Sequence, residues 1–487
     1  MKNSNSQKVI KGISSQTLVT ILLGIVGVLF FSIMSRLLSR EEFGLFASVT
    51  AVAAIFSNIS DGGIGAALIQ RKNMTEDFKN TSFTLALICS GIFAFLLAIS
   101  SGFLAHIIVG EQLHYPLMIM ALTVLFQGIL SVNFSWMRRH LQFLKIGIIQ
   151  IVANLIASVI SVFMALAGFG VYAILTHVVA GSFLTLFISF FFVNTRFRIQ
   201  LKRAYIRSIL NFGGWLTGSI IIHSISSQID RLLMSKLISV TALGAYNRPK
   251  EFVLQIGTRI NGIFDTALFP VLSNIQDQKE SLRNAFCRSQ YLMNICSMGL
   301  AMSFIINSEL IIRIFFGEDW IDLKPVFQII SLSLLLNINA RLGDCFLRSL
   351  GFVRQQFIFR VLELIVDVVC ILIGYRYGII GVAISFLMAN IVHIVLKTMF
   401  LAWKMQITQK DIVYNVLGGW AYGTYFIPFI FIQYFLLPDS LYADIVSLIT
   451  FVIIMFLLFI MFPRLIGHQY QNEIYPKIIS VFPKFLR

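Results

Sequence analysis

Charged residues are scarce in this chain of 487 residues, and acidic ones are the scarcest. Asp and Glu number 22 against 38 Lys and Arg, and these four types together make up 12% of the chain, whereas hydrophobic residues make up 57%. Because a soluble globular domain carries about 25% charged residues, this composition excludes a soluble protein and is typical of a polytopic helical membrane protein.

Cysteine, histidine and proline are also few, at 5, 7 and 9 residues. The cysteines and histidines show no spacing typical of metal ligands, and the sequence has no P-loop and no arrangement of a nucleophile with a base. The segment Gly168–Ala173 resembles a dinucleotide-binding fingerprint only superficially, because it lies between two hydrophobic runs with no strand before it. We therefore expect no metal, no cofactor and no enzymatic activity.

Long hydrophobic runs fill the chain instead. A membrane-spanning helix needs about 20 apolar residues. The first run extends from about Ile13 to Leu38, which is too long for the core of a signal peptide, so we expect it to be retained as a span. The runs predict fourteen spans, at residues 13–35, 43–67, 81–105, 115–137, 146–167, 170–193, 209–234, 242–269, 288–312, 325–347, 356–375, 378–402, 414–437 and 441–463.

Basic residues alternate between the two sides of these predicted spans. The segments on the side of the N-terminus carry most of the Lys and Arg, whereas the opposite segments hold few, Arg36 and Lys236 among them. The positive-inside rule then places both termini in the cytoplasm. The formal net charge of +16 follows from this orientation and from attraction to an anionic cytoplasmic leaflet, so we expect no nucleic-acid partner.

Two parts of the sequence resemble each other at a nearly constant offset. Phe43–Phe46 (FGLF) matches Leu243–Tyr246 (LGAY) at an offset of 200 residues. Six predicted spans separate the copies, an even number, so the halves should be parallel repeats. The sequence predicts an all-α polytopic membrane protein with a six-helix N-terminal lobe and basic linker at 1–208, a six-helix C-terminal lobe at 209–405, and two additional helices with a cytoplasmic tail at 406–487. The linker, about 194–208, is predicted to be an interfacial helix.

Polar residues inside the predicted spans fall on helical stripes. In spans seven, eight, ten and eleven they recur every three or four residues, so each set shares one helix face. The first half is plainer, and its clear intramembrane charge is Asp61, which is followed by Gly62, Gly63 and Gly65. A structural ion pair explains any single charge equally well, but the whole set favours a hydrated substrate cavity, because charges inside a bilayer are costly.

Three stretches carry a resemblance to a known family. Ser35–Phe46 (SRLLSREEFGLF), Asp230–Arg248 (DRLLMSKLISVTALGAYNR) and Ala267–Ser273 (ALFPVLS) resemble bacterial polysaccharide flippases of the O-antigen and exopolysaccharide type. These form the polysaccharide transport branch of the multidrug/oligosaccharidyl-lipid/polysaccharide (MOP) exporter superfamily. The resemblance implies a V-shaped two-lobe fold in the bacterial cell inner membrane. It also implies a transporter, working by alternating access, that flips undecaprenyl-diphosphate-linked oligosaccharide to the outer leaflet for O-antigen (lipopolysaccharide), capsule or exopolysaccharide biosynthesis.

A diphosphate head requires cationic partners, and Arg suits bidentate phosphate contact. The candidate substrate-binding residues are Arg36, Arg231, Arg248, Lys250, Arg259 and Arg341, and the candidates for coupling to H+ or Na+ are Asp61, His223 and Asp230. The implied partners are the lipid-linked oligosaccharide, membrane lipids and the coupling ion, with a glycan polymerase and glycosyltransferases as further partners. The alternative is a drug or metabolite:cation antiporter of the same superfamily, which the fourteen spans and the basic excess disfavour.

Overall fold

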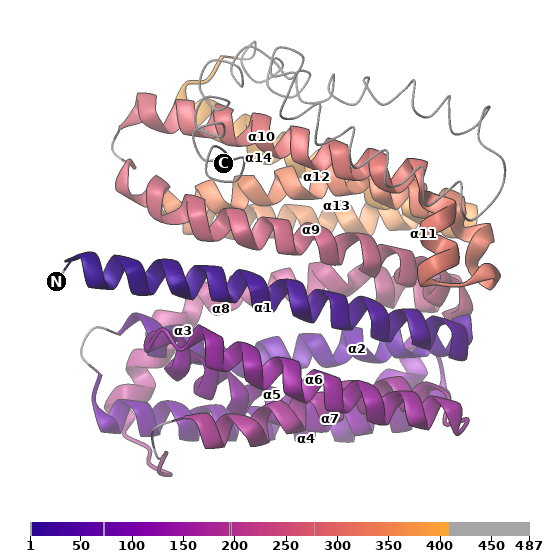
Figure 1. The fold of residues 1–487 in the computed structure, drawn as a ribbon, viewed down its shortest axis with the longest axis horizontal. Coiled ribbons are helices and arrows are strands. Elements are labelled where there is room, and N and C mark those ends of the chain that lie inside the picture. Colours follow the sequence, from indigo (N-terminus) through magenta and orange to yellow (C-terminus); the bar gives the residue numbers. More distant parts are fainter. Residues whose placement is uncertain (1, 72–73, 194, 196, 277, 409–487) are drawn as a thin grey trace, which may run out of the picture. The chain divides into compact units, whose positions relative to one another are not determined.

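The computed structural model describes residues 2–71, 74–193, 195, 197–276 and 278–408, and every regular element in these ranges is a helix (Figure 1). The long helices are α1 (Lys2–Leu37), α2 (Arg40–Asp61), α4 (Glu76–Ile108), α5 (His114–Arg139), α6 (Phe143–Leu166), α7 (Val171–Phe192), α8 (Arg203–Leu237), α9 (Val240–Asn274), α10 (Lys279–Ile306), α12 (Lys324–Ser349), α13 (Val353–Gly374) and α14 (Gly378–Met405). The short ones are α3 (Ile64–Gln70), α11 (Ser308–Phe315), η1 (Glu111–Leu113), η2 (Glu318–Leu323) and η3 (Tyr375–Tyr377).

The predicted all-α polytopic fold is confirmed. Most of each of the first twelve predicted spans lies within one long helix. Within the described residues, eight helices are long and apolar enough to cross a membrane. The predicted spans 414–437 and 441–463 lie outside the described residues, so the count of fourteen stays a prediction.

The two copies of the repeated motif begin their helices in the same way. Ser39 precedes α2, and its Oγ accepts a hydrogen bond from the backbone N–H of Glu42 at 3.3 Å, while the Glu42 carboxylate accepts one from the backbone N–H of Ser39 at 2.7 Å. Ser239 precedes α9 and accepts from the backbone N–H of Ala242 at 3.0 Å. A cap of this kind stabilises a helix by about 1 kcal/mol. The repeat therefore includes a helix start as well as an apolar pattern.

The chain divides into two compact units. The first comprises Met1–Arg248 and Arg360–Gly381, and the second comprises Pro249–Phe359 and the chain from Val382 onward. Helix α9 contributes its first turns to one unit and the rest to the other. These units are defined by contacts and are not the lobes at 1–208 and 209–405 that the sequence repeat predicts, and those lobes remain a prediction.

Small residues bring the helices of the first unit close together. Helix α5 packs on α4 and α7, and α6 packs on α1 and α7 (Figure 1). A Cβ added to Gly147 of α6 would lie 2.2 Å from Val19 Cγ2 of α1, and one added to Gly128 of α5 would lie 2.4 Å from Ser90 Cβ of α4. Close backbone approach of this type holds membrane helices together, because lipid offers no hydrophobic drive for their association.

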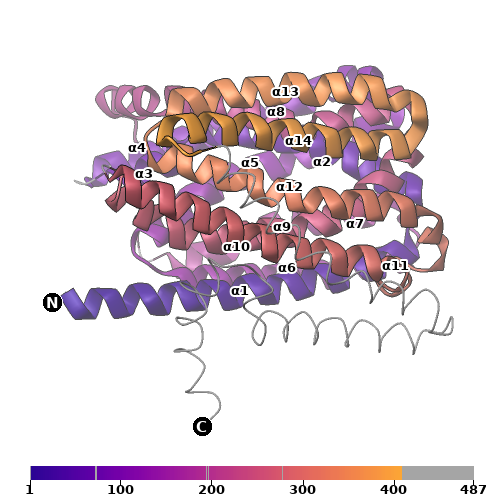
Figure 2. The same cartoon turned by 90° about the horizontal axis from the view of Figure 1, so that it is seen from above.

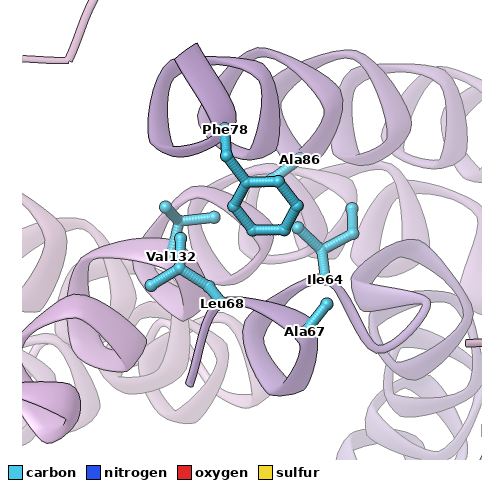
Figure 3. Close-up of a cluster of buried hydrophobic side chains, with 6 residues drawn as sticks. All are labelled: Ile64, Ala67, Leu68, Phe78, Ala86 and Val132. Carbon is cyan, nitrogen blue, oxygen red and sulfur yellow. The ribbon is translucent and has the colours of Figure 1, made fainter. Parts of the chain in front are cut away.

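Span two differs from its prediction, since the run at 43–67 is not one helix. Helix α2 ends at Asp61, Gly62 and Gly63 adopt left-handed conformations with φ of 49° and 74°, and α3 starts at Ile64. Left-handed backbone is accessible to glycine at little cost, which is why the break falls on this pair. Figure 3 shows the Phe78 ring of α4 packed against Ile64 and Ala67 of α3 in a buried cluster with Leu68, Ala86 and Val132.

The basic linker is also different from the prediction. Residues 197–202 are not helical, and the helix begins only at Arg203, where it continues as α8. The reason is a run of side-chain acceptors on α4, which takes up alternate backbone N–H groups of the linker. Arg198 N donates to Asn80 Oδ1 at 3.0 Å, and Gln200 N donates to Thr84 Oγ1 at 2.9 Å. An extended segment satisfies its polar backbone in this way without forming a helix.

The second unit is built around α10 and α12, which lie side by side (Figures 1 and 2). The predicted ninth span, 288–312, ends earlier than expected, because α10 stops at Ile306 and a separate helix, α11, follows. Helix α11 is tied to the start of α12 by an ion pair of 2.8 Å between Glu309 and Lys324. Phe316, the residue after α11, belongs to an aromatic cluster in which the Phe252 ring of α9 lies near the rings of Phe304, Phe316 and Phe327.

Candidate functional site

A polar cluster lies inside the first unit, formed by side chains of α8, α9 and α13. Ser226 donates a hydrogen bond to Asp367 Oδ2 at 2.8 Å. Asp230, one turn further along α8, is 6% exposed, and the hydroxyl of the fully buried Tyr246 interacts electrostatically with Asp230, Arg231 and Asp367. Two carboxylates thus share a region of low dielectric with one guanidinium. Such a region stabilises a bound cation or proton.

Arg248 lies in a different environment of the first unit, at 3% exposure. Its Nε donates to Ser35 Oγ at 2.9 Å, and its Cζ lies 5.0 Å from the ring centroid of Phe31 and 5.7 Å from that of Phe43. A guanidinium over ring faces gains a cation–π interaction that grows as the group is desolvated. In this conformation Arg248 therefore connects α9 to α1 and α2.

The starts of α2 and α9 are in direct backbone contact beside Arg248. A Cβ added to Gly244 would lie 2.8 Å from the backbone nitrogen of Gly44. These are the matching glycines of the sequence repeat, so the two copies of the motif pack on each other. With the predicted orientation, the contact lies at the outer end of both helices.

In the second unit, Lys250 is 6% exposed, and its Nζ lies 4.4 Å from the ring centroid of Phe386 on α14. Arg259 is half-buried on α9, and Arg341 is exposed on α12. The two helices interlock two residues before Arg259 and two turns before Arg341, because a Cβ added to Gly257 would lie 2.6 Å from Leu334 Cδ1. The second unit thus brings two of the predicted cations to neighbouring helices.

The other candidates lie in the first unit. Arg36 is exposed near the end of α1, and His223 is half-buried on α8. Asp61, at the end of α2, accepts a hydrogen bond from the hydroxyl of Ser131 on α5. Of the nine candidates, Asp230 and Arg231 are thus joined in one cluster, whereas Asp61 has partners of its own on α5.

Two charged residues that form buried or half-buried polar contacts, Asp367 and Lys397, were not among the predicted site residues. Asp367 completes the cluster around Asp230, and its signal was the polar stripe of span eleven. Lys397 is 3% exposed on α14, and its Nζ lies 2.8 Å from Asp344 Oδ1 on α12. Its signal was a lone basic residue in an otherwise apolar run, which requires a buried partner.

No group of three or more His, Cys, Asp or Glu side chains within the described residues could hold a metal ion. Within the first unit, carboxylates lie on α2, α8 and α13, and within the second unit cationic side chains lie on α9 and α12.

Comparison with known proteins identifies the family. The model of a family described as polysaccharide biosynthesis protein matches residues 33–325, more than half of the chain. The chain belongs to this family. It is 25% identical over 403 residues to the lipopolysaccharide biosynthesis protein WzxC of Escherichia coli (strain K12), and the match covers 80% of both chains. It is also 25% identical over 389 residues to a putative O-antigen transporter of Shigella flexneri, with 76% of this chain and 91% of that protein covered.

Solved structures show which fold this member of the polysaccharide biosynthesis family adopts. The lipid II flippase MurJ in an inward closed conformation matches with a TM-score of 0.73 at 13% identity, over 92% of this chain and 98% of that chain. A multidrug resistance MATE transporter of the MOP superfamily in an inward-facing conformation matches with a TM-score of 0.64 at 14% identity, over 82% and 99%. The predicted resemblance is confirmed, and the chain is a multi-pass protein of the bacterial inner membrane.

Proposed function

We propose that this protein flips an undecaprenyl-diphosphate-linked oligosaccharide from the cytoplasmic to the outer leaflet for the synthesis of a surface polysaccharide, acting as a transporter and not as an enzyme. Family membership supports the pathway, and the similarity to an O-antigen transporter and to a lipid II flippase supports the activity. The drug or metabolite:cation antiporter is less supported, because the MATE fold matches less well than MurJ, at a TM-score of 0.64 against 0.73.

The pair Arg259 and Arg341 carries the proposal. Helix α10 returns the chain between α9 and α12, so these two run in the same direction. Gly257 packs on Leu334 of α12, and the two arginines follow that contact on their respective helices. Arg259 follows this contact by two residues and Arg341 by seven, so their backbone positions differ by about 8 Å along the helix direction. Two arginines on adjacent helices suit the two adjacent phosphates of a lipid diphosphate, because each fork binds phosphate through paired hydrogen bonds.

The transport cycle is proposed to use the contact between Gly44 and Gly244 as its outer closure. With both termini in the cytoplasm, the starts of α2 and α9 face the outside. Arg248 holds the same ends together through Ser35 and the ring faces of Phe31 and Phe43. Separation of these ends would open the outer side and release the oligosaccharide to the outer leaflet.

The cluster of Ser226, Asp230 and Asp367 is proposed to bind the coupling cation, H+ or Na+, with His223 on the same helix. Two carboxylates close to one arginine leave a net negative charge, which a cation neutralises. The helix that carries Asp230 also carries Arg231, so cation binding and head-group binding would be linked through one element. Glycosyltransferases would act on the substrate before this step, and a glycan polymerase would act on it afterwards.

The test is flipping of a fluorescent lipid-linked oligosaccharide by the purified protein in proteoliposomes. Arg259→Ala and Arg341→Ala should each slow flipping at least about tenfold, since a lost charge-assisted hydrogen bond costs about 1.5–3 kcal/mol. Arg348→Ala is the matched control, because Arg348 is an exposed arginine two turns further along α12. Unchanged flipping by the double variant Arg259→Ala/Arg341→Ala would remove the pair from the substrate path.

A further inference from the structure

The linker at 197–202 contacts α4 through one edge of its backbone. Alternate N–H groups donate to side chains of α4, among them that of Arg198 to Asn80 at 3.0 Å and that of Lys202 to Thr81 at 3.3 Å. These two acceptors are adjacent in α4 and differ by about 1.5 Å along its axis, whereas an extended chain covers about 13 Å between the two donors. The linker therefore runs across α4, and its two faces point toward opposite ends of that helix.

The polar face of the linker points toward the start of α4. Gln200 Nε2 donates to Asp77 Oδ1 at 3.0 Å, and Lys202 Nζ donates to Asp77 Oδ2. Asp77 lies in the first turn of α4. Because alternate side chains of an extended segment share a face, the exposed side chain of Arg198 lies on this face as well. With the predicted orientation, this is the cytoplasmic end of α4, so the polar face is directed toward water.

The other face of the linker is apolar and points toward the middle of α4. The Phe197 ring stacks on the Phe83 ring of α4, with the centroids 4.7 Å apart. Phe83 lies six residues beyond Asp77, which is about 9 Å further along the helix. Ile199 and Leu201 share this face by alternation, and they are 80% and 49% exposed. Two large apolar side chains thus point toward the bilayer without cover from the described part of the protein.

The linker lies where α4 leaves the hydrocarbon part of the bilayer. Helix α4 has 33 residues, so it is about 50 Å long, whereas the hydrocarbon core is about 30 Å thick. Trp136 and Tyr205 pack on the same buried cluster as Phe197, and Thr75 donates a hydrogen bond to the Tyr205 hydroxyl at 3.3 Å. Because Trp and Tyr concentrate at the membrane–water interface, these contacts place the linker at the depth of the lipid head groups.

We propose that residues 197–203 lie in the membrane surface as an amphipathic extended segment that binds anionic phospholipid. Ile199 and Leu201 insert among the lipids, and Arg198 and Arg203 contact lipid phosphates. The segment carries three cations and no Asp or Glu, so its charge complements an anionic leaflet. A protein partner would not require apolar side chains toward the bilayer and polar ones toward water. The proposed lipid contact does not depend on the proposed transport.

The test of depth is tryptophan fluorescence of the full-length protein in lipid nanodiscs, with the wild-type emission subtracted because the chain has 5 Trp of its own. In Ile199→Trp and in Leu201→Trp, phospholipid brominated near the head-group end of its chains should quench the added emission by at least about half. Arg198→Trp is the matched control, because it is adjacent and exposed but lies on the opposite face. Its emission should be quenched by aqueous iodide and not by the brominated lipid.

The test of lipid charge compares brominated phosphatidylglycerol with brominated phosphatidylcholine, each as the same minor fraction of a mixed bilayer. In Ile199→Trp the phosphatidylglycerol should be preferred about fivefold, the contribution of one basic residue at an anionic surface. Adding Arg203→Gln should reduce this preference, whereas Arg376→Gln, which removes an exposed arginine of η3, should leave it unchanged.

Quenching of the added Trp at Ile199 and Leu201 by iodide alone would overturn the proposal and leave this surface to a protein partner. Equal quenching by the two brominated lipids would overturn the binding of anionic phospholipid. A protein whose linker inserts as expected but that fails to flip glycan would contradict the proposed function and leave the lipid contact intact.

Discussion

Gly44 and Gly244 lie 200 residues apart in the sequence, and each packs against the backbone at the start of the other's helix, α9 and α2 respectively. A Cβ on Gly44 would lie 1.9 Å from the carbonyl oxygen of Val240, and a Cβ on Gly244 would lie 1.8 Å from that of Arg40. The two contacts exchange equivalent positions, because 40 corresponds to 240 and 44 to 244. The contact is therefore self-complementary, as a two-fold axis between the motif copies requires.

Alanine at either glycine should separate these helices. The added Cβ would overlap backbone carbonyls, which cannot rotate away, so we expect Gly44→Ala and Gly244→Ala each to lower the free energy of unfolding by about 1–3 kcal/mol. Thermal unfolding in detergent measures this. Gly91→Ala is the control, because nothing lies within 4 Å of its Cβ position on α4; equal stability of all three variants would contradict the close contact.

Removing one partner of the buried pair Lys397–Asp344 should destabilise the second unit. Both side chains are almost fully buried, and an uncompensated buried charge costs about 3–5 kcal/mol. We expect Lys397→Met or Asp344→Leu alone to lower the unfolding temperature, and Lys397→Met combined with Asp344→Leu to restore most of it. If the double variant is as unstable as the singles, the pair is not an isolated structural contact.

Loss of the Arg139 guanidinium should loosen α3 without unfolding the protein. Three backbone carbonyls at the end of α3 share its Nη1 as donor, and hydrogen bonds to charged groups contribute about 1.5–3 kcal/mol. Hydrogen exchange of the peptide covering 64–71 should accelerate in Arg139→Ala. The neighbouring Arg138→Ala should leave it unchanged, since Arg138 makes none of these three bonds; equal exchange in both variants would refute the cap.

Acidification should weaken the attachment of α11, which lies outside the candidate spans. The hydrogen bond from Lys324 holds the pKa of the Glu309 carboxyl below its ordinary range; desolvation opposes this shift, and the charges of Lys324 and Arg313 reinforce it. Because the folded pKa is lowered, the stabilisation is fully present above the unfolded pKa of about 4.3 and is lost as pH falls through the folded pKa.

The expected size of this effect is up to about 1 kcal/mol, since half-exposed ion pairs are screened by solvent. Unfolding temperature measured from pH 6 down to about pH 3 should fall less steeply in Glu309→Gln than in the wild type. Glu318→Gln is the control, because Glu318 is 73% exposed and lies 3.6 Å from Arg313. A wild-type pH profile in Glu309→Gln would exclude this ion pair as the cause.

Much of the fold could be predicted because the length of each apolar run alone determines where a membrane-spanning helix forms. A run of about 20 apolar residues can satisfy its backbone in a bilayer only as a helix, so composition predicts twelve of the observed helices directly. The places where helices break or do not form could not be predicted in this way. The pair Gly62–Gly63 sits inside an apolar run, and the linker at 197–202 becomes extended only because Asn80 and Thr84 of α4 accept its backbone N–H groups.

The candidate site was predictable only in part. Helical periodicity assigns Asp230 and Arg259 to polar faces, but it does not say which neighbouring helix each face meets. The partner of Asp344 is Lys397, and that of Ser226 is Asp367, 141 positions away. Pairings at such separations depend on helix packing, and the hydrophobic effect does not select among neighbours inside a bilayer, because lipid tails are as apolar as the side chains.

The sequence by itself determined a polytopic helical membrane protein, an internal repeat that pairs Phe43–Phe46 with Leu243–Tyr246, and a surplus of cations in its second half. Apolar length, glycine placement and helical period are local properties of the chain, so no neighbour is needed to read them. Only the tertiary structure decided that Gly44 meets Val240, that Arg248 lies on aromatic rings, and that Ser226 meets Asp367. These outcomes depend on close packing of small residues and on buried polar pairs, which form only between helices already side by side.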